Sequence, residues 1–183
     1  MKKGLVVLFA MLLVLCSAVS AFAQDGVLYV LCTPQEEWCQ GMEEEFEAVY
    51  PEIDVQWNRL SSGEALARVQ AEKGNPSFDV WWGGPMDAFI AAKAEGGLLA
   101  QYESPSLANV LEKFQYLVDV DHYYAPIYMG TIGFMTNTNW LEAHPGVEAP
   151  TSYYDLLKPE YKGQVMISHP STAGTGYTFL SSV

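Results

Sequence analysis

The sequence has 183 residues, half of them hydrophobic, and a formal net charge of −13. This length corresponds to roughly one to one and a half domains, and the composition is that of a globular protein. The acidic balance argues against a nucleic-acid-binding protein and against an anionic membrane surface as partner, because no basic surplus can release counterions. A small anionic solute remains compatible with it, since backbone N–H groups bind anions even in acidic proteins.

The first 23 residues have the pattern of a cleavable export signal. Two lysines precede an unbroken apolar run over residues 5–15, and a small-x-small cleavage site ends at Ala23. The run is shorter than the roughly 20 apolar residues of a membrane-spanning helix. We expect cleavage after Ala23 and a mature chain in the periplasm or on the extracellular side of the cell envelope.

Export bears on the two cysteines of the mature chain, Cys32 and Cys39. In an oxidising compartment, two cysteines this close in sequence favour a disulfide over free thiols. A zinc site would need further ligands, and no histidine lies nearby in the sequence. We expect the bond to join the end of the first strand to the opening turns of the next helix.

Three strand–helix units follow the signal segment. The predicted strands are residues 27–31, 53–57 and 78–84, and the predicted helices are residues 36–50, 63–73 and 86–94. Helices of this length act as crossovers, which makes the strands parallel. The carboxyl ends of the strands then lie on one edge of the sheet, and so do the loops Thr33–Gln35, Ser61–Gly63 and Gly83–Pro85.

The patterns after residue 98 are weaker. The predicted elements are a helix at 107–117, a bent strand or lobe crossing at 123–136, short helices at 140–143 and 152–157, a strand at 163–167 and a helix opening at 177–180. The sequence stops at Val183 inside this last helix, so we expect an N-terminal fragment of a longer protein.

The segment Ser171–Gly176 lies between the last predicted strand and the last predicted helix. Hydroxyls and glycines at a helix start leave N–H groups and the positive end of the helix dipole facing the strand edge. Such an arrangement suits a phosphate, carboxylate or phosphonate, although an ordinary Ser/Thr N-cap uses the same residues. It is not a nucleotide P-loop, because no lysine follows the last glycine.

The residues give little support for an enzyme. Ser171 lacks the G-x-S-x-G elbow of a hydrolase, and only His169 among the histidines lies near the Ser171–Gly176 segment. Tyrosine pairs such as Tyr153-Tyr154 occur at ferric sites, but aromatic doublets more often pack together. We therefore assign no catalytic residue, no cofactor and no metal site.

Four stretches together carry a family resemblance. They are D-V-W-W-G-G-P at the end of the third strand, I-Y-M-G-T-I-G-F-M-T-N, D-L-L-K-P-E-Y-K-G at 155–163, and S-H-P-S-T-A-G-T-G-Y-T. With them, residues 27–183 resemble the periplasmic solute-binding proteins of ABC importers. The resemblance is closest to the ferric-iron, sugar-phosphate and phosphonate branch of the type II fold.

The resemblance implies a two-lobed α/β protein with a cleft between the lobes. Residues 24–126 would form the first lobe, and residues 127–183 a hinge strand, near Pro126–Thr136, and the start of an incomplete second lobe. The implied function is capture of a small anionic solute, phosphorylated or phosphonate-type, by a monomer that delivers it to an ABC permease with its cytoplasmic ATPase. The alternatives are a ferric-iron transport protein of the same family, a secreted hydrolase and a ligand-sensing domain.

The resemblance also implies a solute site between loops of both lobes. Iron-binding members typically place a histidine or other ligand after the first strand and a glutamate after the third, where this chain has Thr33–Gln35 and Gly83-Gly84. Iron is therefore disfavoured on the first-lobe side. The expected ligand-binding residues are Thr33, Pro34, Gln35, Ser61, Ser62, Gly63, Gly83, Gly84, Ser171, Thr172, Ala173, Gly174 and Thr175.

Overall fold

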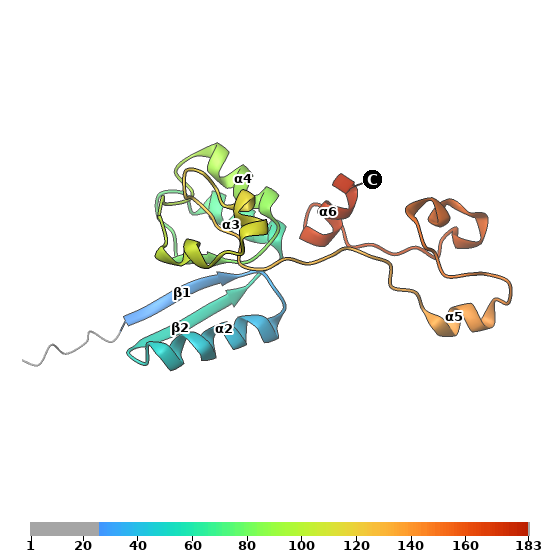
Figure 1. Cartoon of the computed structure of the whole chain (residues 1–183), viewed down its shortest axis with the longest axis horizontal. Coiled ribbons are helices and arrows are strands. Elements are labelled where there is room, and N and C mark those ends of the chain that lie inside the picture. Colours follow the sequence, from blue (N-terminus) through green and yellow to red (C-terminus); the bar gives the residue numbers. More distant parts are fainter. Residues whose placement is uncertain (1–25, 183) are drawn as a thin grey trace, which may run out of the picture.

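The computed structural model describes residues 26–182, so the export signal predicted at residues 1–23 lies outside the described part. The first half consists of β1 (Gly26–Cys32), α2 (Glu36–Val49), β2 (Ile53–Arg59), α3 (Ser62–Ala71), β3 (Val80–Trp82) and α4 (Met86–Glu95). The three strands are parallel and lie in the order β2-β1-β3, as the strand–helix alternation predicts. Figure 1 shows these elements as the compact blue-to-green part of the molecule.

Both faces of β1 are covered at its carboxyl end, where Val30, Leu31 and Cys32 are buried, whereas Val27 and Tyr29 nearer its start are about half exposed. Successive side chains on a strand point to opposite faces. Leu31 packs with Ala65 and Val69 of α3, and Trp81 joins this cluster from β3. Cys32 points to the other face, where it is bonded to Cys39 of α2. The sheet therefore lies between α2 and α3, and its carboxyl edge faces the starts of the helices.

The prediction of a helix at 107–117 is wrong, because the structure has two 3-10 segments there, Pro105–Asn109 and Glu112–Leu117. The Gln115 side chain donates hydrogen bonds to the carbonyls of Leu107 and Val110, at 3.2 and 2.7 Å. An α-helix would need both carbonyls for its own backbone N–H groups. The side chain thus holds the break between the two segments.

Lys93 of α4 anchors the chain that follows these segments. Its Nζ donates to Asp119 at 2.5 Å and to Asp121 at 2.7 Å. Burial acts to raise the pKa of Asp119, but hydrogen bonds from Lys93 and the Tyr123 N–H outweigh it and hold that pKa below its usual range. The ion pair fixes the start of the segment that leaves the compact part.

No strand forms near Pro126–Thr136, where the resemblance implies a hinge strand. Residues 125–137 run extended, without strand hydrogen bonds, from the compact part to α5 (Thr138–Ala143) (Figure 1). The Asn137 side chain caps α5 by accepting the Trp140 N–H at 3.2 Å. No strand of the described residues lies alongside the extended segment, so its N–H and C=O groups cannot form a ladder.

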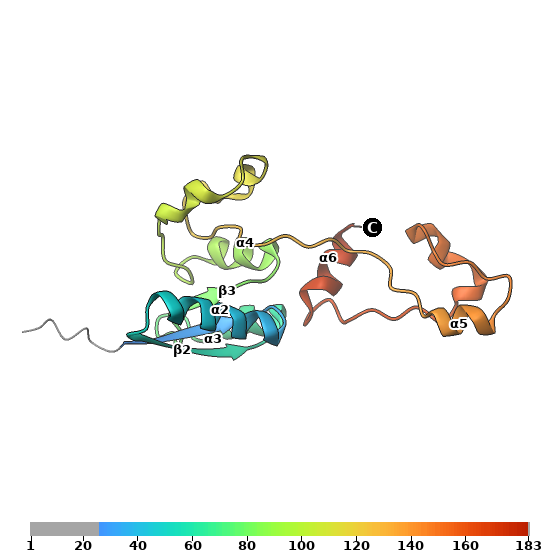
Figure 2. The same ribbon diagram turned by 60° about the horizontal axis from the view of Figure 1, so that its bottom comes forward.

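The last part of the chain holds only short elements. Two 3-10 segments, Tyr153–Leu157 and Pro159–Tyr161, precede the helix α6 (Gly174–Ser182). The strand predicted at 163–167 does not form, and Met166 is 96% exposed, because no neighbouring strand is present among the described residues to pair with it. In Figures 1 and 2, α6 lies between the compact part and the segment that carries α5. No helix in the described range is long and apolar enough to cross a membrane.

Candidate functional site

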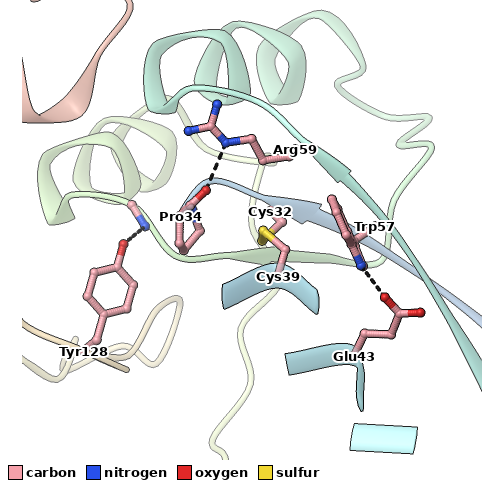
Figure 3. Close-up of a disulfide and its surroundings, with 8 residues drawn as sticks. Cys32, Pro34, Cys39, Glu43, Trp57, Arg59 and Tyr128 are labelled. Carbon is pink, nitrogen blue, oxygen red and sulfur yellow. Dashed lines mark hydrogen bonds between the residues drawn. A yellow bond between two sulfur atoms is a disulfide. The ribbon is translucent and has the colours of Figure 1, made fainter. Parts of the chain in front are cut away.

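A disulfide between Cys32 and Cys39 holds the loop after β1. The two Cα atoms are 6.1 Å apart, and both residues are fully buried. Figure 3 shows the bond joining the end of β1 to the first turn of α2, with Pro34 in the loop between them. The bond therefore limits the movement of Thr33–Gln35, the first of the loops expected to bind a solute.

The loops after all three strands meet at the carboxyl edge of the sheet. The Thr33 N–H donates to the Trp82 carbonyl at 3.1 Å. A Cβ atom added at Gly84 would lie 2.9 Å from the Thr33 Oγ1 and 3.7 Å from the Ser62 Oγ. Gly84 has φ +116°, which disfavours any other residue there. The loops are thus in direct contact, as their position in the predicted sheet requires.

Thr33 places an unpaired hydroxyl in this contact. The residue is only 7% exposed, and its Oγ1 has no hydrogen-bond partner among the described residues. Leaving a buried hydroxyl unpaired costs about 1–3 kcal/mol, so such groups call for an explanation. A solute oxygen bound between the loops would provide the missing partner.

The segment before α6 lies against these loops. The Gly63 N–H in the first turn of α3 donates to the Thr172 carbonyl at 3.1 Å. A Cβ atom added at Gly174 would lie 2.8 Å from both the Ser62 Oγ and the Pro85 Cγ. The N-termini of α3, α4 and α6 therefore converge, each with a positive dipole end, although the Gly63 N–H of α3 is already bonded to Thr172.

The predicted serines and threonines do not all face this convergence. The Ser61 N–H and hydroxyl both donate to Glu64, at 3.0 and 2.6 Å, so Ser61 caps α3. The Ser171 hydroxyl lies 2.7 Å from the His169 Nδ1, and the Thr172 hydroxyl donates to the His169 carbonyl at 3.2 Å. The side chains of Gln35 and Thr175 form no hydrogen bond with the described residues of the other loops, and Ala173 has no polar side-chain atom.

The Ser171–His169 pair does not have the arrangement of a catalytic triad. Both the N–H and the hydroxyl of Ser171 approach the same ring nitrogen of His169. Within residues 26–182, no carboxylate is hydrogen-bonded to the ring to orient it, which a triad requires. The contact instead closes a three-residue turn that shapes the loop before α6.

Two carboxyl groups stand at the helix starts. Hydrogen bonds from the Ser61 side chain and backbone lower the pKa of Glu64, so it stays ionised at the N-terminus of α3. Burial raises the pKa of Asp87 in the first turn of α4. In the described range, no group of three His, Cys, Asp or Glu side chains lies close enough together to hold a metal ion.

Sequence reasoning missed two residues that join this site. The Arg59 Nε donates to the Pro34 carbonyl at 3.0 Å, and the Gly84 N–H donates to the Tyr128 hydroxyl at 3.0 Å (Figure 3). The Tyr128 ring also meets Trp38 edge-on, with ring centroids 5.2 Å apart. Arg59 could have been found as the cation that precedes the Ser61–Gly63 loop. Tyr128 could not, because it lies 44 residues beyond Gly84.

Comparison with known sequences identifies relatives among exported binding proteins. Residues 86–183 match the family model described as bacterial extracellular solute-binding protein. An uncharacterized Haemophilus influenzae protein is 38% identical over 167 residues, which are 90% of this chain and 48% of that protein. A candidate 2-aminoethylphosphonate-binding periplasmic protein of Salmonella typhimurium is 27% identical over 124 residues, 68% of this chain and 33% of that protein.

Solved structures share the fold. The periplasmic binding protein P5PA matches with a TM-score of 0.78 and 35% identity, over 86% of this chain and 50% of that chain. AfuA from Actinobacillus pleuropneumoniae, solved with fructose-6-phosphate bound, matches with a TM-score of 0.77 and 34% identity, over 84% and 48%. The chain thus spans about half the length of these structures and of the Haemophilus relative.

These matches confirm the expected fold class. The parallel sheet with helices on both faces is the α/β architecture of type II periplasmic binding proteins, to which both solved neighbours belong. The family model covers more than half of the chain, including the segment before α6 that meets the strand-end loops. The chain therefore belongs to the family of bacterial extracellular solute-binding proteins.

Proposed function

We propose that the protein is the solute-binding component of an ABC importer and that it captures a phosphorylated or phosphonate-type solute. The observation that carries the proposal is the convergence of three helix N-termini around the buried, unpaired Thr33 hydroxyl. Helix N-termini favour anions through their free N–H groups and their dipoles. The buried hydroxyl is an independent sign that a ligand atom belongs there.

The named ligands of similar proteins support the same chemistry. One neighbour was solved with fructose-6-phosphate, and one relative is named for 2-aminoethylphosphonate. These two molecules differ in their organic parts, but both carry a phosphorus atom with negatively charged oxygens. We assign this shared group to the strand-end loops and leave the organic part to the remainder of the site.

The proposed mechanism needs no covalent chemistry. A solute that contacts both the strand-end loops and the Ser171–Gly174 segment favours the arrangement in which they lie together. A membrane permease with its ATPase would recognise this closed form. The export signal at residues 1–23 would deliver the protein to the periplasm, where it would act as a monomer.

A binding screen tests this function. The mature form of the full-length gene product is titrated with fructose 6-phosphate, 2-aminoethylphosphonate, inorganic phosphate, unphosphorylated fructose and ferric citrate. We expect saturable heat signals and a change in tryptophan fluorescence with a phosphorylated or phosphonate compound, and none with fructose. Binding of ferric ion alone, or release of inorganic phosphate from the ester, would contradict the proposal.

A matched pair of serine variants checks where the solute binds. Ser62 lies between Gly84 and Gly174, whereas Ser106 is exposed in the first 3-10 segment. We expect Ser62→Ala to weaken binding of the positive compound by about 10-fold or more, since a hydrogen bond to a charged group contributes about 1.5–3 kcal/mol. Ser106→Ala should leave the affinity unchanged.

A further inference from the structure

Arg59 occupies a position that no other cation of the described residues shares. It is the last residue of β2 and pairs in register with Cys32, so it lies at the carboxyl edge of the sheet. The Ser61–Gly63 loop begins two residues later. No other lysine or arginine occurs in the strand-end loops or in the Ser171–Thr175 segment.

The Arg59 guanidinium is held in place at only one nitrogen. Its Nε donates to the Pro34 carbonyl, and Pro34 lies between Thr33 and the disulfide-linked helix (Figure 3). Its Nη groups donate no hydrogen bond to any described residue. The hydrogen bond therefore restrains the guanidinium at its Nε and leaves the two Nη groups of this exposed side chain free.

The other cations of the described chain mostly have acidic partners. Arg68 pairs with Glu72, Lys73 with Glu95, Lys93 with Asp119 and Asp121, and Lys158 with Asp155. Arg59 forms no ion pair with the described residues, although the protein has a formal net charge of −13. The Oε2 of Glu64 accepts the N–H and hydroxyl of Ser61, and these bonds lower the pKa of Glu64 more than the nearby Arg59 charge does.

Ligand charge decides what such a group recognises. Helix N-termini present neutral N–H donors that carry only partial positive charges. These donors bind a carboxylate or a phosphate monoanion as well as a phosphate dianion. A guanidinium adds a full positive charge and two parallel N–H donors, a geometry that matches two oxygens of one phosphoryl group. A guanidinium therefore binds a phosphoryl dianion more tightly than a monoanion.

We propose that Arg59 selects the ligand by charge: its Nη groups pair with the dianionic form of a phosphoryl or phosphonyl group held at the strand-end loops. This inference rests on the proposed function and adds to it the ionisation state of the ligand and the residue that reads it. It makes Arg59 a specificity-determining residue of the site.

The test compares three variants by calorimetry with fructose 6-phosphate and 2-aminoethylphosphonate. Arg59→Gln keeps a donor for the Pro34 carbonyl but removes the positive charge. Arg59→Lys keeps the positive charge but replaces the planar guanidinium with a compact ammonium group. Lys113→Gln is the control, because it removes an exposed positive charge outside the site. We expect about 10- to 100-fold weaker binding for Arg59→Gln, since hydrogen bonds between charged groups are worth about twice neutral ones. Arg59→Lys should recover part of the loss, and Lys113→Gln should bind like the parent.

The pH dependence separates charge recognition from a structural role. A phosphate ester loses its second proton near pH 6. The parent protein should therefore bind fructose 6-phosphate more tightly at pH 7.5 than at pH 5, and Arg59→Gln should lose most of this gain. A merely structural Arg59 would lower affinity equally at both pH values, and thermal unfolding reports whether the variants are folded.

The outcomes distinguish this inference from the proposed function. If the parent binds the probe and Arg59→Gln binds with the same affinity and the same pH profile, the role of Arg59 is overturned and the function stands. If the parent binds neither fructose 6-phosphate nor 2-aminoethylphosphonate, the proposed function fails and the role of Arg59 falls with it.

Discussion

Thr33 carries a polar atom where a valine methyl group would cost nothing. Its hydroxyl is buried against Gly84 and lacks a partner in the described chain. Natural proteins keep such unsatisfied groups where function needs them, and lose stability for it. Removing the Thr33 hydroxyl should therefore stabilise the ligand-free protein and weaken solute binding.

Thr33→Val separates the two effects. We expect the free energy of unfolding of the ligand-free protein to rise by about 1 kcal/mol, because an isosteric methyl group replaces an unpaired buried hydroxyl. The affinity for fructose 6-phosphate should fall by about 10-fold. Urea unfolding and calorimetry measure the two quantities, with the exposed Thr131→Val as control. A loss of stability would mean that the hydroxyl already has a partner.

The elements of the first half could be predicted because their signals are local. Apolar runs, helical periodicity and breakers such as Pro51 and Gly74 lie within each strand–helix unit. Strands β1 and β2 pair with neighbours that the same pattern provides. The segment at 163–167 has an equally apolar pattern, but a strand forms only when another strand hydrogen-bonds to it. That partner is a non-local requirement.

For the candidate site, the sequence predicted which loops lie together but not how their side chains are oriented. The parallel order placed Thr33–Pro34, Ser62–Gly63 and Gly83–Gly84 at one edge, and the structure brings them together. The S-x-x-E spacing of Ser61 and Glu64 is a capping-box pattern that sequence reasoning missed. The orientation of the Ser171 and Thr172 hydroxyls could not be read from sequence, because it depends on the turn that brings them to His169. Tyr128 was missed for a different reason, since only the path of residues 125–137 brings it to Gly84.

The disulfide is the covalent link between two elements of the site. Cys32→Ala with Cys39→Ala should lower the free energy of unfolding by about 2–3 kcal/mol, the chain-entropy value for a loop this short. Solute affinity should also fall, because the Thr33–Gln35 loop loses one of its anchors. Urea unfolding of the variant, and of the parent with and without a reductant, measures the effect. Equal stabilities would show that the bond does not form in solution.

At the scale of the whole molecule, Gly63 allows the Ser171–Gly174 segment to lie in direct contact with the strand-end loops. A Cβ atom at Gly63 would lie 2.2 Å from the Ser171 carbonyl oxygen and 2.9 Å from the Thr172 Cα. These are backbone atoms, so the whole Ser171–Gly174 segment would have to move away. The contact between the strand-end loops and the segment before α6 therefore requires a residue without a Cβ atom at position 63.

Gly63→Ala tests closure, and Gly41→Ala is its control. An added Cβ at Gly41 of α2 meets nothing within 4 Å. Gly41→Ala should stabilise the interior of α2 by about 1 kcal/mol, whereas Gly63 lies in the first turn of α3, where this gain is smaller. We expect Gly63→Ala to bind fructose 6-phosphate at least about 10-fold more weakly and to have a larger radius of gyration by X-ray scattering with the solute present. Unchanged affinity and size would show that this contact plays no part in binding.

The Thr172 carbonyl that accepts the Gly63 N–H has a consequence for closure. In the proposed closed form this bond already uses the Gly63 N–H, so a bound solute is held by other donors at the strand-end loops. A solute that displaced the Thr172 carbonyl would open the contact on which closure depends. This N–H therefore reports whether the two segments are closed, and amide hydrogen exchange at Gly63 should slow when the solute binds.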